Sequence, residues 1–173
     1  MPELLLLRHA KSDWADPKLA DHDRPLAPRG RRDAPRMAAY MAREGLLPDI
    51  VLCSTSLRTR QTLDLISSRV ALPDDVRFEK GLYLAEAEAL LDRLRQLPKG
   101  AARVLVIGHN PGLHELALSL CGSGDPTMLE RLTDKFPTCA LAVISFKGNE
   151  WRRLAPGAAQ LDRLVSPKLL VSS

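Results

Sequence analysis

The sequence is poor in cysteine and in aromatic residues. Its three cysteines, Cys53, Cys121 and Cys139, are odd in number and widely spaced, so neither a disulfide framework nor a CxxC-type zinc site is indicated. Reduced thiols in a reducing compartment are the simplest expectation. Aromatic residues make up only 4% of the chain, which leaves few rings on which single-stranded nucleic acid could stack.

The hydrophobic run near the N-terminus is too short for a signal peptide or a membrane span. It extends from Leu4 to Leu7 and ends at Arg8, whereas a membrane-spanning helix needs about 20 apolar residues. We therefore expect a cytoplasmic protein that does not contact a membrane.

The remaining composition is that of an ordinary globular protein. The chain has 173 residues, of which 45% are hydrophobic and 27% charged, and this predicts one domain over residues 1–173. The formal net charge is +4, and 18 of the 25 basic residues are arginine, whose guanidinium group binds phosphate as a bidentate fork. Because the excess charge is small and scattered, we expect an anionic small ligand or a phosphorylated protein as partner rather than nucleic acid. The oligomeric state is left open.

Segments with strand and helix patterns alternate along the chain. Such alternation predicts an α/β fold, a three-layer α/β/α sandwich with a mainly parallel central sheet. Pro111 suits the first helical position of its helix, with Asn110 as the cap. A loop is expected at 11–25, a closing hairpin at 141–146 and 150–154, and a tail from Asp162 onward. Strands are expected at 3–8, 49–53, 76–78 and 103–107, and helices at 28–44, 57–70, 85–97 and 111–120.

Polar side chains follow three of the predicted strands directly. Arg8 and His9 follow the first strand, Arg58 lies in the first turn of the helix after the second, and His109 follows the RVLVI strand. The carboxyl ends of parallel strands meet at one edge of a sheet, so these four side chains should face one crevice. Helix N-termini and arginines attract anions, and a neutral imidazole can attack phosphorus. The pattern predicts a phosphate site.

The segments around these residues resemble the histidine phosphatase superfamily. LLLLRHAKSDW resembles its Arg-His-Gly signature, CSTSLRTRQTLDL its second-arginine segment and VIGHNPGLHEL its second-histidine segment. Three further stretches, DHDRPLAPRGRRDA, GLYLAEAEALLDRL and KFPTCALAVISF, resemble the SixA-type phosphohistidine phosphatase branch. The resemblance runs from Leu4 to about Pro156.

The resemblance implies a metal-independent phosphatase without a cofactor, acting through a phosphohistidine intermediate. His9 would attack phosphorus and become phosphorylated, and Arg8, Arg58 and His109 would hold the phosphoryl oxygens. Water would then hydrolyse the phosphohistidine. The substrate would be phosphohistidine in a protein. The glycine that follows the nucleophile in the family is Ala10 here, for which we expect a slight local adjustment.

Several supporting residues are less well defined by the sequence. Ser12 and Asn110 are further candidates for substrate binding. The general acid is open among Asp21, Asp23 and Glu79, and Asp21-His22-Asp23 is favoured because it lies in the loop facing the predicted pocket. An Asx-type turn is an equally good interpretation of that segment.

Other interpretations remain at this stage. A cysteine phosphatase would need five residues between Cys53 and Arg58, and there are four, none of them glycine. A small-molecule phosphomonoesterase or mutase of the same superfamily is possible, although the short segment 72–103 leaves little room for a lid and favours a bulky phosphoprotein. A non-catalytic phosphate-binding module is the third alternative. The cluster of Arg29, Arg31 and Arg32 is expected to be a solvated helix start or, less favoured, a site for an acidic partner.

Overall fold

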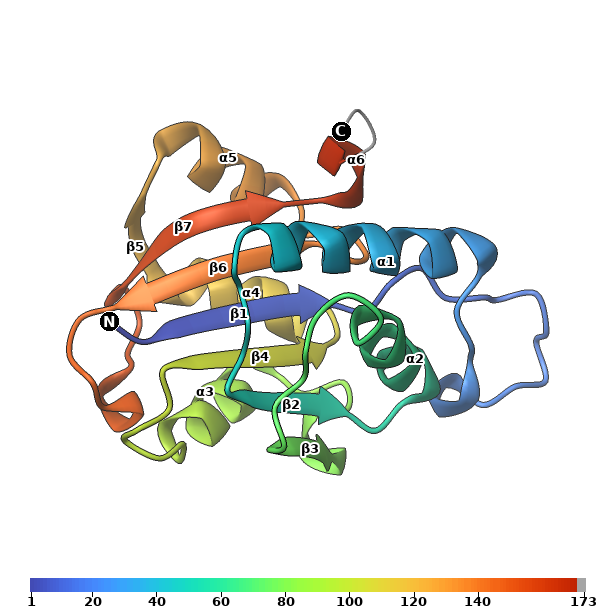
Figure 1. Ribbon diagram of the computed structural model, residues 1–173, viewed down its shortest axis with the longest axis horizontal. Coiled ribbons are helices and arrows are strands. Elements are labelled where there is room, and N and C mark those ends of the chain that lie inside the picture. The colour runs from blue at the N-terminus through green and yellow to red at the C-terminus, as the bar shows by residue number, and fades with distance from the viewer. Residues whose placement is uncertain (171–173) are drawn as a thin grey trace.

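A seven-stranded sheet runs through the computed structural model, which describes residues 1–170 (Figure 1). Three short 3-10 turns, at Asp21–Asp23 (η1), Lys80–Leu82 (η2) and Trp151–Arg153 (η3), connect its elements. The strands are β1 (Glu3–Arg8), β2 (Ile50–Ser54), β3 (Val76–Glu79), β4 (Arg103–Gly108), β5 (Cys121–Gly124), β6 (Leu141–Phe146) and β7 (Ala159–Val165). The helices are α1 (Pro28–Arg43), α2 (Leu57–Ile66), α3 (Ala87–Arg95), α4 (Gly112–Leu120), α5 (Pro126–Asp134) and α6 (Pro167–Leu170).

The sheet is mainly parallel, as predicted. Its strand order is β3-β2-β4-β1-β6-β7-β5. β1 pairs in parallel with β4, and β4 with β2, so the ends of these three strands lie at one edge. Only β6 runs in the opposite direction, antiparallel to both β1 and β7.

Helices cover both faces of the sheet, which makes a three-layer α/β/α sandwich. In β1, Leu4 and Leu6 pack toward α3 and α4, whereas Leu5 and Leu7 pack toward α1 and α2. Figure 1 shows α1 and α2 in front of the sheet and α3 and α4 behind it. Because both faces are buried, the strand is a continuous apolar run rather than an alternating one.

The N-terminal part of α1 packs very closely on the chain just after β1. A Cβ atom at Gly30 would lie 2.3 Å from the carbonyl oxygen of Lys11, and the Ala27 N–H donates to the same oxygen at 2.9 Å. The absence of a side chain at Gly30 therefore lets α1 approach the segment that follows His9. The helix ends before Gly45, whose φ of +67° favours glycine.

The predicted hairpin and tail near the C-terminus are wrong. Segment 150–154 forms η3 instead of a strand, and β7 pairs with β6 in its place. Trp151 is fully buried, and its indole Nε1 donates to the Ala101 carbonyl at 2.9 Å. This burial holds the segment against α3, and the chain then returns to the sheet as β7, where a tail was expected.

Other differences are local. β5 and α5 were not predicted, while α2 and α3 are shorter than the predicted helices. Asn110 does not cap α4: Pro111 occupies the N-cap position, and the Asn110 side chain donates to the Phe136 carbonyl instead. The Asn110–Pro111 peptide bond is cis. None of the helices within residues 1–170 is long and apolar enough to cross a membrane.

Candidate active site

The structure brings Arg8, His9, Arg58 and His109 together where β1, β2 and β4 end. The rings of His9 and His109 have their centroids 5.4 Å apart. An Nη2 of Arg58 lies 3.4 Å from Nδ1 of His109. His9, His109 and Arg58 are all buried. The convergence expected from the strand ends is therefore present.

The backbone and α2 hold the His9 segment in place. Nδ1 of His9 lies 2.7 Å from the Ala10 carbonyl oxygen, which can only accept, so Nδ1 carries the hydrogen. The Ala10 N–H donates to Oγ1 of Thr62 at 3.0 Å, and the Cys139 N–H donates to the His9 carbonyl at 2.9 Å. In this tautomer Nε2 has a free lone pair, as a nucleophile requires.

Two neighbours determine the tautomer of His109. The Arg58 guanidinium can only donate, so Nδ1 of His109 is the acceptor of that contact. Nε2 therefore carries the hydrogen and donates to Oγ of Ser54 at 2.7 Å. Ser54 is the last residue of β2 and is fully buried, and it thus fixes the orientation of the ring.

Both histidines are neutral in this site. The pKa of His9 is lowered to about 4, mainly because the ring is buried. The hydrogen bond to Ala10 acts in the opposite direction, and the positive charges of Arg58 and Arg8 lower the pKa further. Burial also lowers the pKa of His109 to about 3, reinforced by His9 and Arg58. A neutral imidazole is the form that can attack phosphorus.

Arg58 is held by Asp21 from the loop before α1. Its Nη1 donates to the Asp21 carbonyl at 2.7 Å and its Nη2 to Oδ2 of the Asp21 carboxylate at 3.0 Å. The hydroxyl of Tyr83 also donates to Oδ2 of Asp21, and the Tyr83 ring packs edge-on against His109. Burial alone would raise the pKa of Asp21, but the hydrogen bonds from Tyr83 and Arg58 lower it overall. Asp21 is therefore a carboxylate at neutral pH.

Arg8 and Asn110 both point to the loop between α5 and β6. Nη1 of Arg8 donates to the Phe136 carbonyl at 3.3 Å, and Nδ2 of Asn110 donates to the same oxygen at 2.8 Å. Nη1 is the only Arg8 side-chain nitrogen with a hydrogen bond to a described residue. The Arg8 fork thus retains donors for an oxyanion.

Three of the candidates have other partners. Oγ of Ser12 accepts from the indole Nε1 of Trp14 at 2.9 Å. Asp23 is exposed, and its ion pair within residues 1–170 is with His22 at 3.8 Å. Glu79 makes a bidentate pair with Arg93 at 2.7 and 2.9 Å. Asp21 is thus the acid candidate that contacts the cluster.

Cys53 cannot act as the alternative nucleophile at neutral pH. It is fully buried in the layer that packs on α1 and α2, and burial raises the pKa of its thiol to about 12. The thiolate that a cysteine phosphatase requires is therefore not formed.

Sequence reasoning missed Tyr83, Ser54 and Thr62 as parts of this site. Ser54 and Thr62 flank Arg58 in the CSTSLRTRQTLDL segment, so their nearness to it was a usable signal. Tyr83 lies in GLYLAEAEALLDRL, directly after η2, and no residue spacing pointed to it. In the part of the chain that the structure describes, no group of three or more His, Cys, Asp or Glu side chains is arranged to hold a metal ion.

Comparison with known proteins identifies the family. A model of the histidine phosphatase superfamily (branch 1) matches residues 4–83. An uncharacterized protein from Mycobacterium tuberculosis is 38% identical, covering 94% of this chain and all of its own length. The phosphohistidine phosphatase SixA of Escherichia coli is 28% identical over 83% of this chain and 84% of its own.

Solved structures extend the similarity to the whole fold. A protein from Nakamurella multipartitia, provisionally assigned to SixA, has a TM-score of 0.82 and 32% identity, covering 96% of each chain. The protein histidine phosphatase SixA complexed with tungstate has a TM-score of 0.80 and 25% identity, covering 97% of this chain and 99% of its own. Together, the family match and the 32% identity to a SixA-type structure over nearly the whole chain show that the chain belongs to the histidine phosphatase superfamily.

Proposed function

We propose that the protein is a phosphatase that transfers a phosphoryl group to His9 and then to water. The observation that carries this proposal is the neutral His9, with its Nε2 lone pair free, beside Arg58 and His109. Arg8 and Arg58 supply positive charge where a phosphoryl group gains charge in the transition state. Membership of the superfamily supports a phosphatase activity.

The reaction has two displacement steps. In the first, the lone pair of His9 Nε2 attacks phosphorus, the bond from phosphorus to the leaving group breaks, and the leaving group takes up a proton from solvent. In the second, water attacks the phosphorus of phosphorylated His9, the P–Nε2 bond breaks and its electron pair returns to Nε2, the attacking water gives up a proton to solvent, and inorganic phosphate leaves. Arg8 and Arg58 hold the oxygens in both steps.

The substrate class that we propose is phosphohistidine in a protein. Segment 72–103, which is too short to leave much room for a lid, is occupied by β3, η2 and α3 up to the first residue of β4. Leu90, Leu91 and Leu94 of α3 are buried in the core on one face of the sheet, so this helix is not available as a cover over His9. A site that α3 does not cover suits a bulky phosphoprotein. The three SixA relatives reported above carry phosphohistidine phosphatase or protein histidine phosphatase in their names, and they support the same class.

A turnover comparison with trapping of the intermediate tests the proposal. The substrates are a phosphohistidine peptide, a sugar phosphate, a nucleotide and an aryl phosphate, the last labelled with radioactive phosphorus. We expect the highest kcat/KM for the phosphohistidine peptide and label on His9 after acid-free quenching. His9→Gln should abolish labelling, whereas His114→Gln, on α4, should not.

Three other results of this experiment would each lead to a different conclusion. Label on His109 would overturn the assignment of the nucleophile. A sugar phosphate or nucleotide as the best substrate would replace the protein substrate by a small molecule. Binding of phosphate without any turnover would make the chain a phosphate-binding module.

A further inference from the structure

A basic groove lies beside the active site, on the other side of the loop between α5 and β6. Its volume is about 490 Å³, and it is lined by α1, by that loop and by the segment from Ser166 to Lys168. The charged side chains of the basic groove are Arg29, Arg32, Arg36, Lys135, Lys168 and Asp33. Three segments far apart in the sequence therefore build one charged surface.

The charge of the basic groove is concentrated and mostly unpaired. Five basic side chains and one acidic side chain give an excess of four positive charges, equal to the formal net charge of the whole chain. Asp33 is buried and lies 3.8 Å from Arg29 and 3.9 Å from Arg36. Arg32, Lys135 and Lys168 make no ion pair with any other residue in 1–170. The rest of the molecule is close to neutral.

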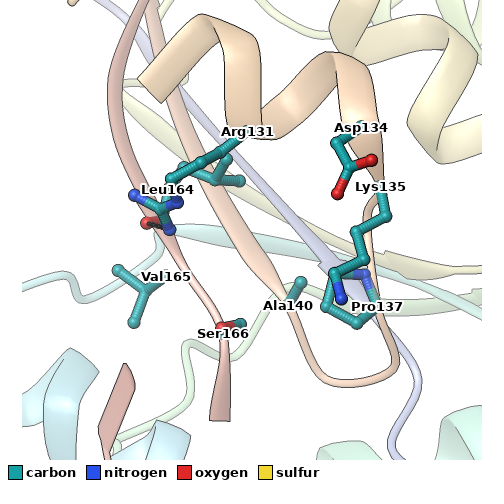
Figure 2. Close-up of a pocket in the computed structure, with 8 residues that line it drawn as sticks. All are labelled: Arg131, Asp134, Lys135, Pro137, Ala140, Leu164, Val165 and Ser166. Carbon is teal, nitrogen blue, oxygen red and sulfur yellow. Dashed lines mark hydrogen bonds between the residues drawn. The ribbon is translucent and has the colours of Figure 1, made fainter. Parts of the chain in front are cut away.

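A smaller pocket continues the basic groove toward α5. Figure 2 shows it between α5, the α5–β6 loop and β7. It has a volume of about 90 Å³ and shares Lys135, Pro137 and Ser166 with the groove. Arg131 lies at its far end and donates to the Leu164 carbonyl at 3.0 Å. Among residues 1–170, no aromatic side chain lines either cavity, so these residues offer no stacking surface for nucleic-acid bases.

The α5–β6 loop is a wall common to the basic groove and the active site. The Phe136 carbonyl accepts from Arg8 on the active-site side. Its neighbours Lys135, Pro137 and Thr138 line the groove, and Oγ1 of Thr138 accepts from Arg29 at 3.4 Å. A large substrate molecule with its phosphoryl group at His9 would therefore bring other parts of its surface close to the basic groove.

We propose that the basic groove docks an acidic segment of the protein that carries the substrate phosphohistidine. This inference rests on the proposed function. The groove is much larger than one phosphate, and the side chains of Arg29 and Arg36 are 59% and 48% exposed. Exposed, spread charges attract and orient a charged surface rather than fix a single ion. Carboxylates along a segment of protein match this pattern.

The test compares two double variants with equal changes of charge. Arg32→Glu with Lys168→Glu reverses two charges of the basic groove, which removes its excess of four, at exposed positions outside the active site. Arg31→Glu with Lys147→Glu makes the same change at exposed positions that do not line the groove. The substrates are phosphohistidine peptides of equal length with acidic or neutral flanking residues, and an aryl phosphate.

We expect the groove variant to lose about tenfold in kcat/KM on the acidic peptide, mainly through KM, because charge complementarity increases association by about 10–10³-fold. Its turnover of the aryl phosphate should be unchanged, and the control variant should match the parent on all three substrates. Equal kcat/KM for acidic and neutral peptides in the parent would overturn the proposal, as would an equal loss in both variants.

A binding measurement separates this proposal from the proposed function. The anisotropy of a fluorescent acidic peptide without phosphate should report binding to the parent and to the control, and weaker binding to the groove variant. If this binding pattern is found but phosphohistidine is not turned over, the proposed function is wrong. The conclusion that the basic groove binds an acidic segment of a protein is then retained. Stronger binding of an RNA oligonucleotide of equal charge would overturn the proposal.

Discussion

At the scale of single residues, the site depends on keeping His9 and His109 uncharged among arginines. Each ring has one nitrogen committed: Nδ1 of His9 to the Ala10 carbonyl, and Nε2 of His109 to Ser54. Arg58, itself buried, disfavours a further positive charge on either ring. Nucleophilic character at neutral pH follows from this environment rather than from an activating base.

The pH dependence of the reaction should show the depressed pKa of His9. We expect kcat/KM, corrected for ionisation of the substrate, to stay level down to about pH 5 and to fall as the pH passes through about 4, where His9 becomes protonated. Rapid pH-jump assays with an aryl phosphate measure this. An acidic limb near 6.5, the pKa of an ordinary histidine, would contradict it.

Circular dichroism over the same pH range is the control. Between pH 6.5 and 4 the unfolded chain binds protons at His9 and His109 that the folded chain does not, so the free energy of unfolding should decrease as the pH falls. The assay is valid only while the protein stays folded.

Asp21 should act by positioning Arg58, because its lowered pKa leaves it no proton to give at neutral pH. Asp21→Asn should slow an aryl phosphate, a phosphohistidine peptide and a sugar phosphate by a similar factor, about 10–10²-fold, through misplacement of Arg58. Asp23→Asn, at an exposed position, is the matched control and should change little. A loss of about 10²–10⁴-fold confined to the poor leaving group of the sugar phosphate would instead identify Asp21 as a general acid.

The residues of the site differ in how far the sequence could predict them. Arg8, His9 and His109 lie at the ends of β1 and β4, and Arg58 lies in the first turn of the helix after β2, so the order of elements was enough to bring them together. Asp21 could not be separated from Asp23, because the path of their loop is set by hydrogen bonds from Arg58 to the Asp21 carbonyl and carboxylate. Tyr83 reaches the site by tertiary packing alone.

At the scale of elements, the sequence predicts best the helices and strands whose ends are marked by neighbouring residues. α1 begins as predicted at Pro28 and ends one residue early, since proline and Gly45 mark its ends. β5, with the sequence CGSG, has no apolar run and pairs in parallel with β7, which follows it by more than thirty residues. The hairpin prediction failed because burial of Trp151 competes with the local turn signal at Gly148.

Gly30 tests the close packing of α1 on the segment after His9. Gly30→Ala should lower the free energy of unfolding by about 1–3 kcal/mol, the usual cost of overpacking, because the new methyl group meets the rigid Lys11 backbone. It should also reduce kcat, since Lys11 is two residues from the nucleophile. Urea denaturation measures the first effect and aryl phosphate turnover the second.

Gly100→Ala is the matched control for this substitution. A Cβ atom at Gly100 has no neighbour within 4 Å, and its φ is outside the region that favours glycine. Stability and kcat should both stay near those of the parent. Equal losses in the two variants would show that the Lys11 contact is not the cause.

At the scale of the whole molecule, the distribution of charge matters more than its total. The basic groove unites residues 29–36, 135–138 and 166–168, and no local pattern in the sequence connects these three segments. From the sequence, the cluster of Arg29, Arg31 and Arg32 was therefore interpreted first as a solvated helix start. Only the tertiary structure shows that Arg29 and Arg32 line the groove.

Chelation should leave the activity of the whole protein intact. Arginine and histidine side chains supply the positive charge that a metal ion supplies in many phosphatases. Prolonged dialysis against EDTA, followed by assay with and without added magnesium, manganese or zinc, should give equal turnover. Loss of activity on dialysis with recovery on addition of one divalent ion would contradict the proposed mechanism.

A site that keeps two imidazoles neutral is poised to take up a proton when an anion binds. The negative charge of inorganic phosphate offsets the field of Arg8 and Arg58, which is part of what lowers the pKa of His9 and His109. Binding of the anion should therefore draw hydrogen ions from solution, so that affinity rises toward acid pH and the heat of binding varies with the ionisation enthalpy of the buffer. The two histidines would thereby make the binding of phosphate to this site depend on the pH of the solution.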